Sequence, residues 1–226
     1  ASICRKVLSA IRTPIIINGV TCHCTASVGV ALFGAHAITP EELLKQADLA
    51  MYQAKDAGRN TVRFFDPQMQ LAVLERIALE RELEDAIGQK QFVVHFQPQI
   101  NDKNKVVGAE ALIRWQHPEE GLLQPGQFLP TIETTELTLP VGEWILHEAI
   151  RQKREWMSKG IDLAISVNVF ALHMQRADFH DRLKDILSLY PDVDPGGLEL
   201  EILETTSLGD LAVISKRIEF CTALGV

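Results

Sequence analysis

The second half of the sequence alternates short apolar segments with helical segments, and this alternation constrains the fold more than any other feature. Near-continuous apolar strands separated by helices are typical of a parallel sheet covered by helices, which predicts an α/β fold. Ligand sites in such sheets lie at the carboxyl ends of the strands. The strands are predicted at 91–100, 105–115, 162–169 and 197–203, and the helices at 142–160, 176–190 and 211–225. The first two strands form a predicted hairpin around the turn-like residues 101–104.

The first 66 residues predict a smaller strand–helix–strand unit. Residues 23–34 are β-branched and apolar, and 61–66 form a second short strand. Between them, Thr39 is a suitable N-cap with Glu42 completing a capping box, and Gly58 is the expected end of the helix. A charged amphipathic helix then leads into the second half of the chain. The predicted organisation is a first domain at 1–67, a linker helix at 68–90 and a second domain at 91–226.

Composition excludes several classes of function. The net charge is −8 over 226 residues without a block of like charges, which argues against a nucleic-acid-binding surface. No apolar run approaches the roughly 20 residues that a membrane span requires, and no signal peptide opens the chain. The four cysteines lack zinc-site spacing and fit reduced thiols in a cytoplasmic protein. Because the sequence starts without Met and ends inside a predicted helix, we interpret it as part of a longer protein, whose membrane anchorage stays open.

Three polar residues interrupt the apolar strands at or near their carboxyl ends: Glu110, Asn168 and Glu201. A lone carboxylate in an apolar strand is costly to bury unless a positive group meets it. Two carboxylates and an amide oxygen are hard donors of the kind that Mg²⁺ and Mn²⁺ prefer. Each residue also has a structural interpretation, as an Arg-paired Glu or as an Asn that caps a loop. Their equivalent places on three strands of one sheet favour a metal site.

Ordered segments of the second half resemble the EAL family of cyclic di-GMP phosphodiesterases, named for the triplet that starts at Glu110. The segments are FQPQI, GAEALIRWQHP, FLPTIE, GEWIL, ISVNV and LELEILE. In the first half, TASVGVALF and ADLAMYQAKDAGRNTVRFF resemble the last third of a GGDEF diguanylate cyclase domain. The two resemblances imply the C-terminal end of a GGDEF domain, which is an α+β cyclase-like fold, followed by an incomplete TIM-like (β/α) barrel of EAL type.

The EAL resemblance implies roles for five residues. Glu110, Asn168 and Glu201 match ligands of two catalytic divalent ions, Mg²⁺ or Mn²⁺. Gln97 and Arg114 match positions that contact the substrate, and the planar fork of an Arg suits phosphate oxygens. A salt bridge to a neighbouring Glu is the alternative for Arg114.

Other matched positions are less direct. Glu204 matches a residue that supports a loop near the dimer face and the substrate, while Leu203 and Phe170 replace the family's usual Thr and small hydroxyl residue. In the GGDEF part, Lys55 and Arg59 match positions that hold GTP phosphates. Solvated cations near the C-terminal end of a helix are an equally adequate explanation of these two residues. The GG[DE]EF signature is absent, so this half is not expected to make cyclic di-GMP.

The resemblance implies that the intact protein hydrolyses cyclic di-GMP to linear pGpG in bacterial signalling, with divalent ions activating the attacking water. The family's later paired Asp, catalytic Lys and final Glu do not occur before Val226. The 226-residue chain itself is therefore expected to be inactive and to carry no catalytic residue beyond the metal ligands. A receptor that binds cyclic di-GMP without cleaving it is the alternative, and an inert fragment is a third interpretation. The resemblance also implies dimerisation through the EAL domain, which the residues leave open.

Overall fold

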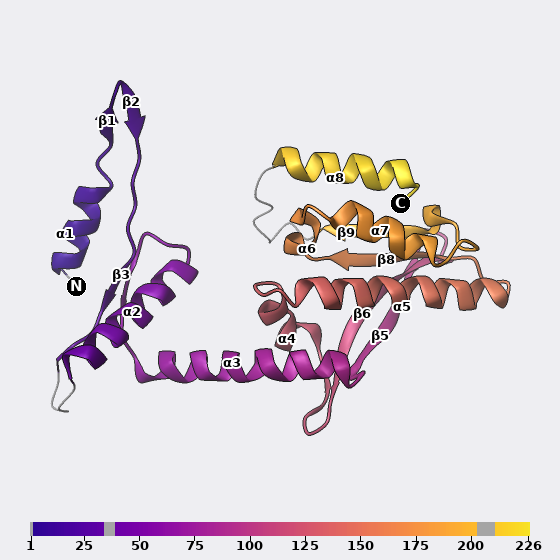
Figure 1. Ribbon diagram of the computed structural model, residues 1–226, viewed down its shortest axis with the longest axis horizontal. Coiled ribbons are helices and arrows are strands. Elements are labelled where there is room, and N and C mark those ends of the chain that lie inside the picture. Colours follow the sequence, from indigo (N-terminus) through magenta and orange to yellow (C-terminus); the bar gives the residue numbers. More distant parts are fainter. Residues whose placement is uncertain (1, 34–38, 203–210) are drawn as a thin grey trace. The chain divides into compact units, whose positions relative to one another are not determined.

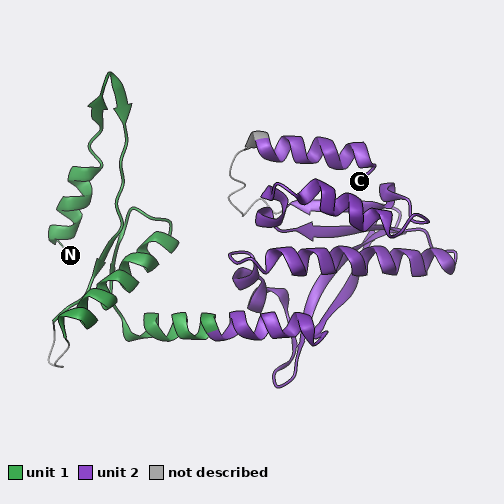
Figure 2. Ribbon diagram, in the orientation of Figure 1, with its two compact units in different colours: residues 1–77 green, residues 78–226 purple. Residues whose placement is uncertain are grey.

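The computed structural model describes residues 2–33, 39–202 and 211–226, and the chain divides into two compact units at 1–77 and 78–226 (Figure 2). The predicted domain bounds at 67 and 90 stay a prediction. Helix α3 carries the chain from the first unit into the second. The elements of the first unit are α1 (Ser2–Ile11), β1 (Ile15–Ile17), β2 (Val20–Cys22), β3 (Val28–Val30), α2 (Pro40–Asp56), β4 (Val62–Phe64) and the start of α3 (Pro67–Gly88).

The predicted strand–helix–strand unit is present as β3, α2 and β4, with β3 and β4 paired in parallel. The capping box of α2 forms as expected. Thr39 Oγ1 accepts from the Glu42 amide at 3.2 Å, and Glu42 Oε2 accepts from the Thr39 amide at 2.9 Å. Helix α2 lies directly on β3, because a Cβ at Gly29 would overlap the helix backbone at Ala47 and Met51. Glycine is therefore required at that position for the helix to pack.

The strand predicted at 23–34 is wrong over most of its length. In the described residues, β2 ends at Cys22 and β3 covers only Val28–Val30, because β3 has just three partners on β4. Residues 15–22 instead form an antiparallel hairpin that was not predicted. Its turn is Asn18-Gly19, both with positive φ (49° and 80°), the pair that a two-residue hairpin turn favours.

The second unit is built on one mixed sheet in the order β5-β6-β8-β9, with β7 added to β6 (Figure 1). The predicted hairpin is confirmed as the antiparallel pair β5–β6, and β6, β8 and β9 are parallel as expected. Its elements are β5 (Phe92–Ile100), β6 (Val106–His117), β7 (Gly121–Leu123), α4 (Pro125–Ile132), α5 (Thr138–Ser158), β8 (Ala164–Val169), α6 (Ala171–Gln175), α7 (Phe179–Ser188), a 3₁₀ turn (Pro195–Gly197), β9 (Leu198–Ile202) and α8 (Leu211–Leu224).

The two faces of this sheet differ sharply in polarity. Alternate residues of each strand, such as Ile113, Ile165 and Val167, are buried against the helices and share a core with Ile145 and Leu183. Because successive side chains of a strand point to opposite faces, the residues between them lie on the other face, and many of those are polar. The apolar face therefore fixes the register, and the polar face is left for a site.

The short elements β7, α4 and α6 and the 3₁₀ turn were not predicted, and neither was α1 in the first unit. Helix α4 has eight residues with Pro130 inside it, and α6 has five. In the described part of the chain the sheet stays open between β5 and β9. In the described ranges no helix is both long enough and apolar enough to cross a membrane.

Candidate functional site

Glu110, Asn168 and Glu201 lie on the polar face of the sheet, where the parallel ladders end. Asn168 pairs with Glu201 across β8 and β9. Glu110 pairs with Ser166 across β6 and β8, one residue before the end of that ladder. Ser166 and Asn168 are two residues apart on one strand and so share a face with Glu110. The structure thus brings the three predicted residues together.

Asn168 and Glu110 contact each other directly. Asn168 Nδ2 donates a hydrogen bond to Glu110 Oε1 at 2.7 Å. Asn168 Oδ1 is buried and has no hydrogen-bond partner among the residues that the structure describes. Leaving such an oxygen unpaired costs about 1–3 kcal/mol. The side chain is therefore held with a free oxygen donor.

A pocket of about 270 Å³ opens beside these three residues and is lined by all of them. The rest of its wall is mostly apolar and comes from the middle of β6, from α4 and α5, and from the connection between β8 and α6. The apolar lining residues are Ala111, Leu112, Ile113, Pro125, Leu129, Ile145, Val169, Phe170 and Ala171. A mostly apolar concavity with a few convergent polar groups is the usual form of a small-molecule site.

Glu133 is a further acidic residue of the pocket that was not predicted as a site residue. It follows directly after α4, and burial raises the pKa of its carboxyl above the ordinary value. A carboxyl with a raised pKa beside other acidic groups marks a candidate functional group. The segment FLPTIE, which ends at Glu133, was the only signal in the sequence that could have identified it.

The two predicted substrate-contacting residues lie on the same face of the sheet. Gln97 on β5 pairs with Glu110 and is exposed. Arg114 lies four residues after Glu110 on β6, and its Nη1 donates to the carbonyl oxygen of Ile113 at 2.9 Å. No ion pair of Arg114 with a Glu is found in the described ranges, so the salt-bridge alternative has no support there. Within the described part of the chain the Ile113 carbonyl oxygen is the only acceptor found for its guanidinium, so the other N–H donors remain for a ligand.

A second polar layer lies below Glu110 on this face. Gln99 Nε2 donates to Ser166 Oγ at 3.2 Å, and Ser166 Oγ donates to Glu199 Oε2 at 3.1 Å. Ser166 is fully buried, whereas Glu199 is exposed. None of these three residues lines the pocket. The layer extends the polar face but leaves the pocket to Glu110, Asn168 and Glu201.

The remaining predicted residues lie elsewhere. Lys55 at the end of α2 and Arg59 just after it are exposed, and the Arg59 amide donates to the Lys55 carbonyl oxygen at 3.2 Å. Their role stays a prediction, with helix-end cations as the alternative. Glu204 and Leu203 lie outside the described residues.

The donor set fits a divalent cation in its chemistry. Glu110, Asn168 and Glu201 offer carboxylate and amide oxygens, and the unpaired Asn168 Oδ1 is an atom that a cation would satisfy. Within the part of the chain that the structure covers, no three His, Cys, Asp or Glu side chains gather closely enough to form a metal site without such an amide. The three residues therefore represent part of a ligand set.

The sequence profile of the EAL domain matches residues 80–226. The chain belongs to the EAL domain family. The profile of the GGDEF domain, described as a diguanylate cyclase domain, matches residues 1–61. The tandem order inferred from the sequence is thereby confirmed, and the α/β architecture is the EAL fold.

This EAL chain is similar to curated proteins over most of its length. It is 39% identical over 228 residues to the bifunctional diguanylate cyclase/cyclic di-GMP phosphodiesterase MucR of Pseudomonas aeruginosa, covering 100% of this chain and 33% of MucR. It is 35% identical over 182 residues to the cyclic di-GMP phosphodiesterase PdeR of Escherichia coli, covering 80% of this chain and 28% of PdeR. The chain thus spans about a third of the length of these curated relatives.

Solved EAL structures show the same architecture. The MucR phosphodiesterase in complex with cyclic di-GMP aligns with a TM-score of 0.61 and 39% identity, over 66% of this chain and 61% of that one. The EAL enzyme Bd1971, in its form with bound cAMP and cyclic di-GMP, aligns with a TM-score of 0.63 and 26% identity, over 84% of this chain and 50% of that one.

Proposed function

We propose that the intact protein is a phosphodiesterase that hydrolyses cyclic di-GMP to linear pGpG and depends on divalent cations. The observation that carries this proposal is the unpaired oxygen of Asn168, held beside Glu110 and Glu201 in the wall of an apolar pocket. Membership of the EAL family and similarity to MucR and PdeR support the substrate.

Glu110, Asn168 and Glu201 would hold the cations, Mg²⁺ or Mn²⁺. Cations bound there would lower the pKa of a water molecule and neutralise charge on the phosphoryl oxygens. Asn168 Nδ2, by donating to Glu110, orients both side chains before a ligand arrives, so little reorganisation is needed.

Arg114 and Gln97 would orient the dinucleotide. They flank Glu110 on the same face, one along β6 and one across the β5–β6 ladder. The guanidinium offers paired donors to phosphate oxygens. The apolar wall formed by Leu129, Ile145 and Phe170 would exclude water and would give a base of the dinucleotide an apolar surface to pack against.

The test compares the intact protein that carries this sequence with two of its variants, using hydrolysis of cyclic di-GMP in the presence of Mn²⁺. We expect Glu110→Ala to lose at least about 100-fold in kcat/KM, the effect of removing a group that stabilises transition-state charge. Glu199→Gln is the matched control, because Glu199 is an acidic residue of the same face that lies outside the pocket. Equal rates for wild type and Glu110→Ala would refute the assignment.

Calorimetry with cyclic di-GMP and Ca²⁺ separates an enzyme from a receptor. Binding together with Mn²⁺-dependent hydrolysis supports the proposal. Binding by a wild-type protein that does not hydrolyse the dinucleotide would identify it as a cyclic di-GMP receptor and would refute the proposed activity.

A further inference from the structure

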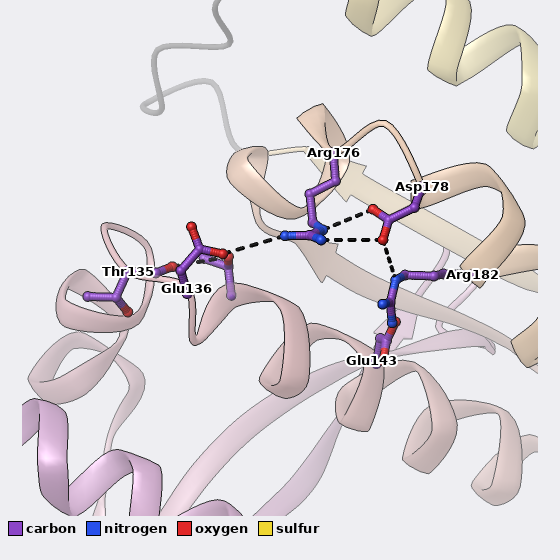
Figure 3. Close-up of polar contacts among 7 residues, drawn as sticks. Thr135, Glu136, Glu143, Arg176, Asp178 and Arg182 are labelled. Atoms are coloured by element: carbon purple, nitrogen blue, oxygen red, sulfur yellow. Dashed lines mark hydrogen bonds and ion pairs between the residues drawn. The ribbon is translucent and has the colours of Figure 1, made fainter.

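A cluster of charged side chains joins helices α5, α6 and α7 (Figure 3). Asp178, the N-cap residue of α7, stands at its centre. Its carboxylate accepts from Arg176 Nε at 2.9 Å and Nη2 at 3.3 Å, and from Arg182 Nε at 2.7 Å. These contacts hold the pKa of the Asp178 carboxyl well below its usual range. Asp178 therefore links the end of α6 with the first turn of α7.

Arg182 extends this cluster to a third helix. Its Nη1 donates to Glu143 Oε1 on α5 at 2.8 Å, so that one guanidinium bridges two carboxylates from different helices. The side chains of Arg182 and Glu143 are 39% and 25% exposed. Because the Arg182 guanidinium contacts both carboxylates, these charges form a network, the arrangement in which exposed ion pairs contribute measurably to stability. The outer contact from Arg176 Nη1 to Glu136, at 3.5 Å, involves a fully exposed carboxylate and is the weaker link.

The same helices supply one side of the pocket. Ile145, two residues after Glu143 on α5, lines it, and so do Val169, Phe170 and Ala171 at the end of β8 and the start of α6. Helix α6 has only five residues and ends beside Arg176. An isolated helix of that length has little stability of its own, so its position depends on what holds its ends.

Helices α5 and α6 also contact each other directly. A Cβ at Gly142 on α5 would lie 2.5 Å from Nδ1 of His173 on α6, and His173 is 1% exposed. The two helices therefore pack so closely at this contact that no larger side chain fits at residue 142.

We propose that Asp178 is a positioning residue that, through Arg182 and Glu143, holds the wall segment 169–171 against α5 and thereby sets the affinity of the pocket for its ligand. The nature of the ligand rests on the proposed function. Asp178 does not line the pocket. It acts on the position of the wall, while Glu110, Asn168 and Glu201 are held by the strand ladders and by the Asn168–Glu110 hydrogen bond.

The test uses steady-state kinetics with cyclic di-GMP on the intact protein and on Asp178→Asn and Glu143→Gln. We expect KM to rise about tenfold with kcat within about twofold of wild type, because the wall contributes binding that is uniform between ground and transition states. Asp178→Glu, which keeps the charge, should recover most of the affinity. Asp192→Asn is the matched control, since it removes a carboxylate that accepts from Arg154 on α5 at 2.6 Å, and neither residue of that pair lines the pocket.

A second measurement does not depend on the ligand. Hydrogen exchange of the amides at 169–176 should be faster in Asp178→Asn and Glu143→Gln than in wild type, and unchanged in Asp192→Asn. Unchanged KM in both variants, or a fall in kcat at constant KM, would overturn the positioning role. If wild type does not act on cyclic di-GMP, the proposed function fails. Independently of that result, unchanged hydrogen exchange at 169–176 in both variants would overturn the positioning role of Asp178.

Discussion

Asn168 and Glu110 form a hydrogen bond that decides which atom of the amide is left for a ligand. Nδ2 donates to Oε1 at 2.7 Å, and Oδ1 remains buried with no partner among the residues described. The opposite orientation would bring two oxygen acceptors together. The hydrogen bond to Glu110 thus fixes the orientation of the Asn168 amide so that its oxygen has no partner among the described residues. The resulting cost in stability would be removed by a bound cation.

Replacing Asn168 by Asp tests this relationship. In Asn168→Asp two carboxylates lie side by side without the amide donor, so like charges destabilise the metal-free protein at neutral pH. We expect a lower Tm in EDTA and a larger increase on adding Mn²⁺ than in wild type, because an extra charge strengthens cation binding. A ligand at 100 times its Kd stabilises by about 2.7 kcal/mol, which thermal unfolding detects readily. Glu199→Gln should respond to Mn²⁺ as wild type does, whereas an identical Mn²⁺ response of Asn168→Asp and wild type would contradict the expectation.

Glu133 gives the metal-free protein a specific dependence on pH. Burial raises the pKa of its carboxyl, so its contribution to stability is fully present below the unfolded pKa of about 4.3 and is lost as pH rises through the folded pKa. Glu133→Gln cannot ionise and should gain stability over wild type as pH is raised from 4 towards 7. Thermal unfolding in EDTA across this range provides the measurement. Glu136→Gln, three residues away and exposed, is the control. Parallel curves for Glu133→Gln and wild type would contradict the raised pKa.

The sequence predicted most of the long, periodic elements and missed most of the short ones, although the ten-residue helix α1 was also missed. The helices α2, α3, α5, α7 and α8 and the strands of the main sheet follow from apolar periodicity, caps and breakers. The hairpin at 15–22 and helices α4 and α6 have three to eight residues per element, too few to establish a period. Their structure depends on neighbours distant in the chain, which a local pattern does not encode.

The same limit applies to the site. Glu110, Asn168 and Glu201 were identified because each interrupts an apolar strand, and the strand register brings them together. Glu133 was missed because it follows a short helix, and its place in the pocket depends on how α4 packs against β6. The Asp178 cluster was missed for a related reason. Its charged residues form no motif in the sequence, and they come together only because helices α5, α6 and α7 pack against one another.

Gly142→Ala tests the close contact between α5 and α6. The added Cβ would lie 2.5 Å from His173 Nδ1, and His173 is too buried to move away. Overpacking of this kind costs about 1–3 kcal/mol, of which the better helix propensity of Ala offsets up to about 1 kcal/mol. We expect a net loss in the free energy of unfolding, measured with urea.

A double-mutant cycle identifies the source of that loss. In the His173→Ala background the ring is absent, so Gly142→Ala should be neutral or stabilising. Gly126→Ala on α4 is the control, because a Cβ there would meet nothing within 4 Å. A loss of equal size in both backgrounds would show that the ring contact is not the cause.

His173, at the contact between α5 and α6, is expected to make the free energy of unfolding decrease at acidic pH. Burial is the main cause that lowers the pKa of its imidazole, and Arg176 and Arg182 act in the same direction against Glu143 and Asp178. Because the folded pKa is below the unfolded value of about 6.5, the contribution to stability is present above pH 6.5 and is lost as pH falls towards the folded pKa.

His173→Gln removes the titration, so its free energy of unfolding should fall less steeply than that of wild type between pH 7 and 5. The difference in slope cannot exceed about 1.4 kcal/mol per pH unit for one proton. His95→Gln, at an exposed position of β5, is the control. Equal slopes for His173→Gln and wild type would show that His173 does not remain neutral in the fold.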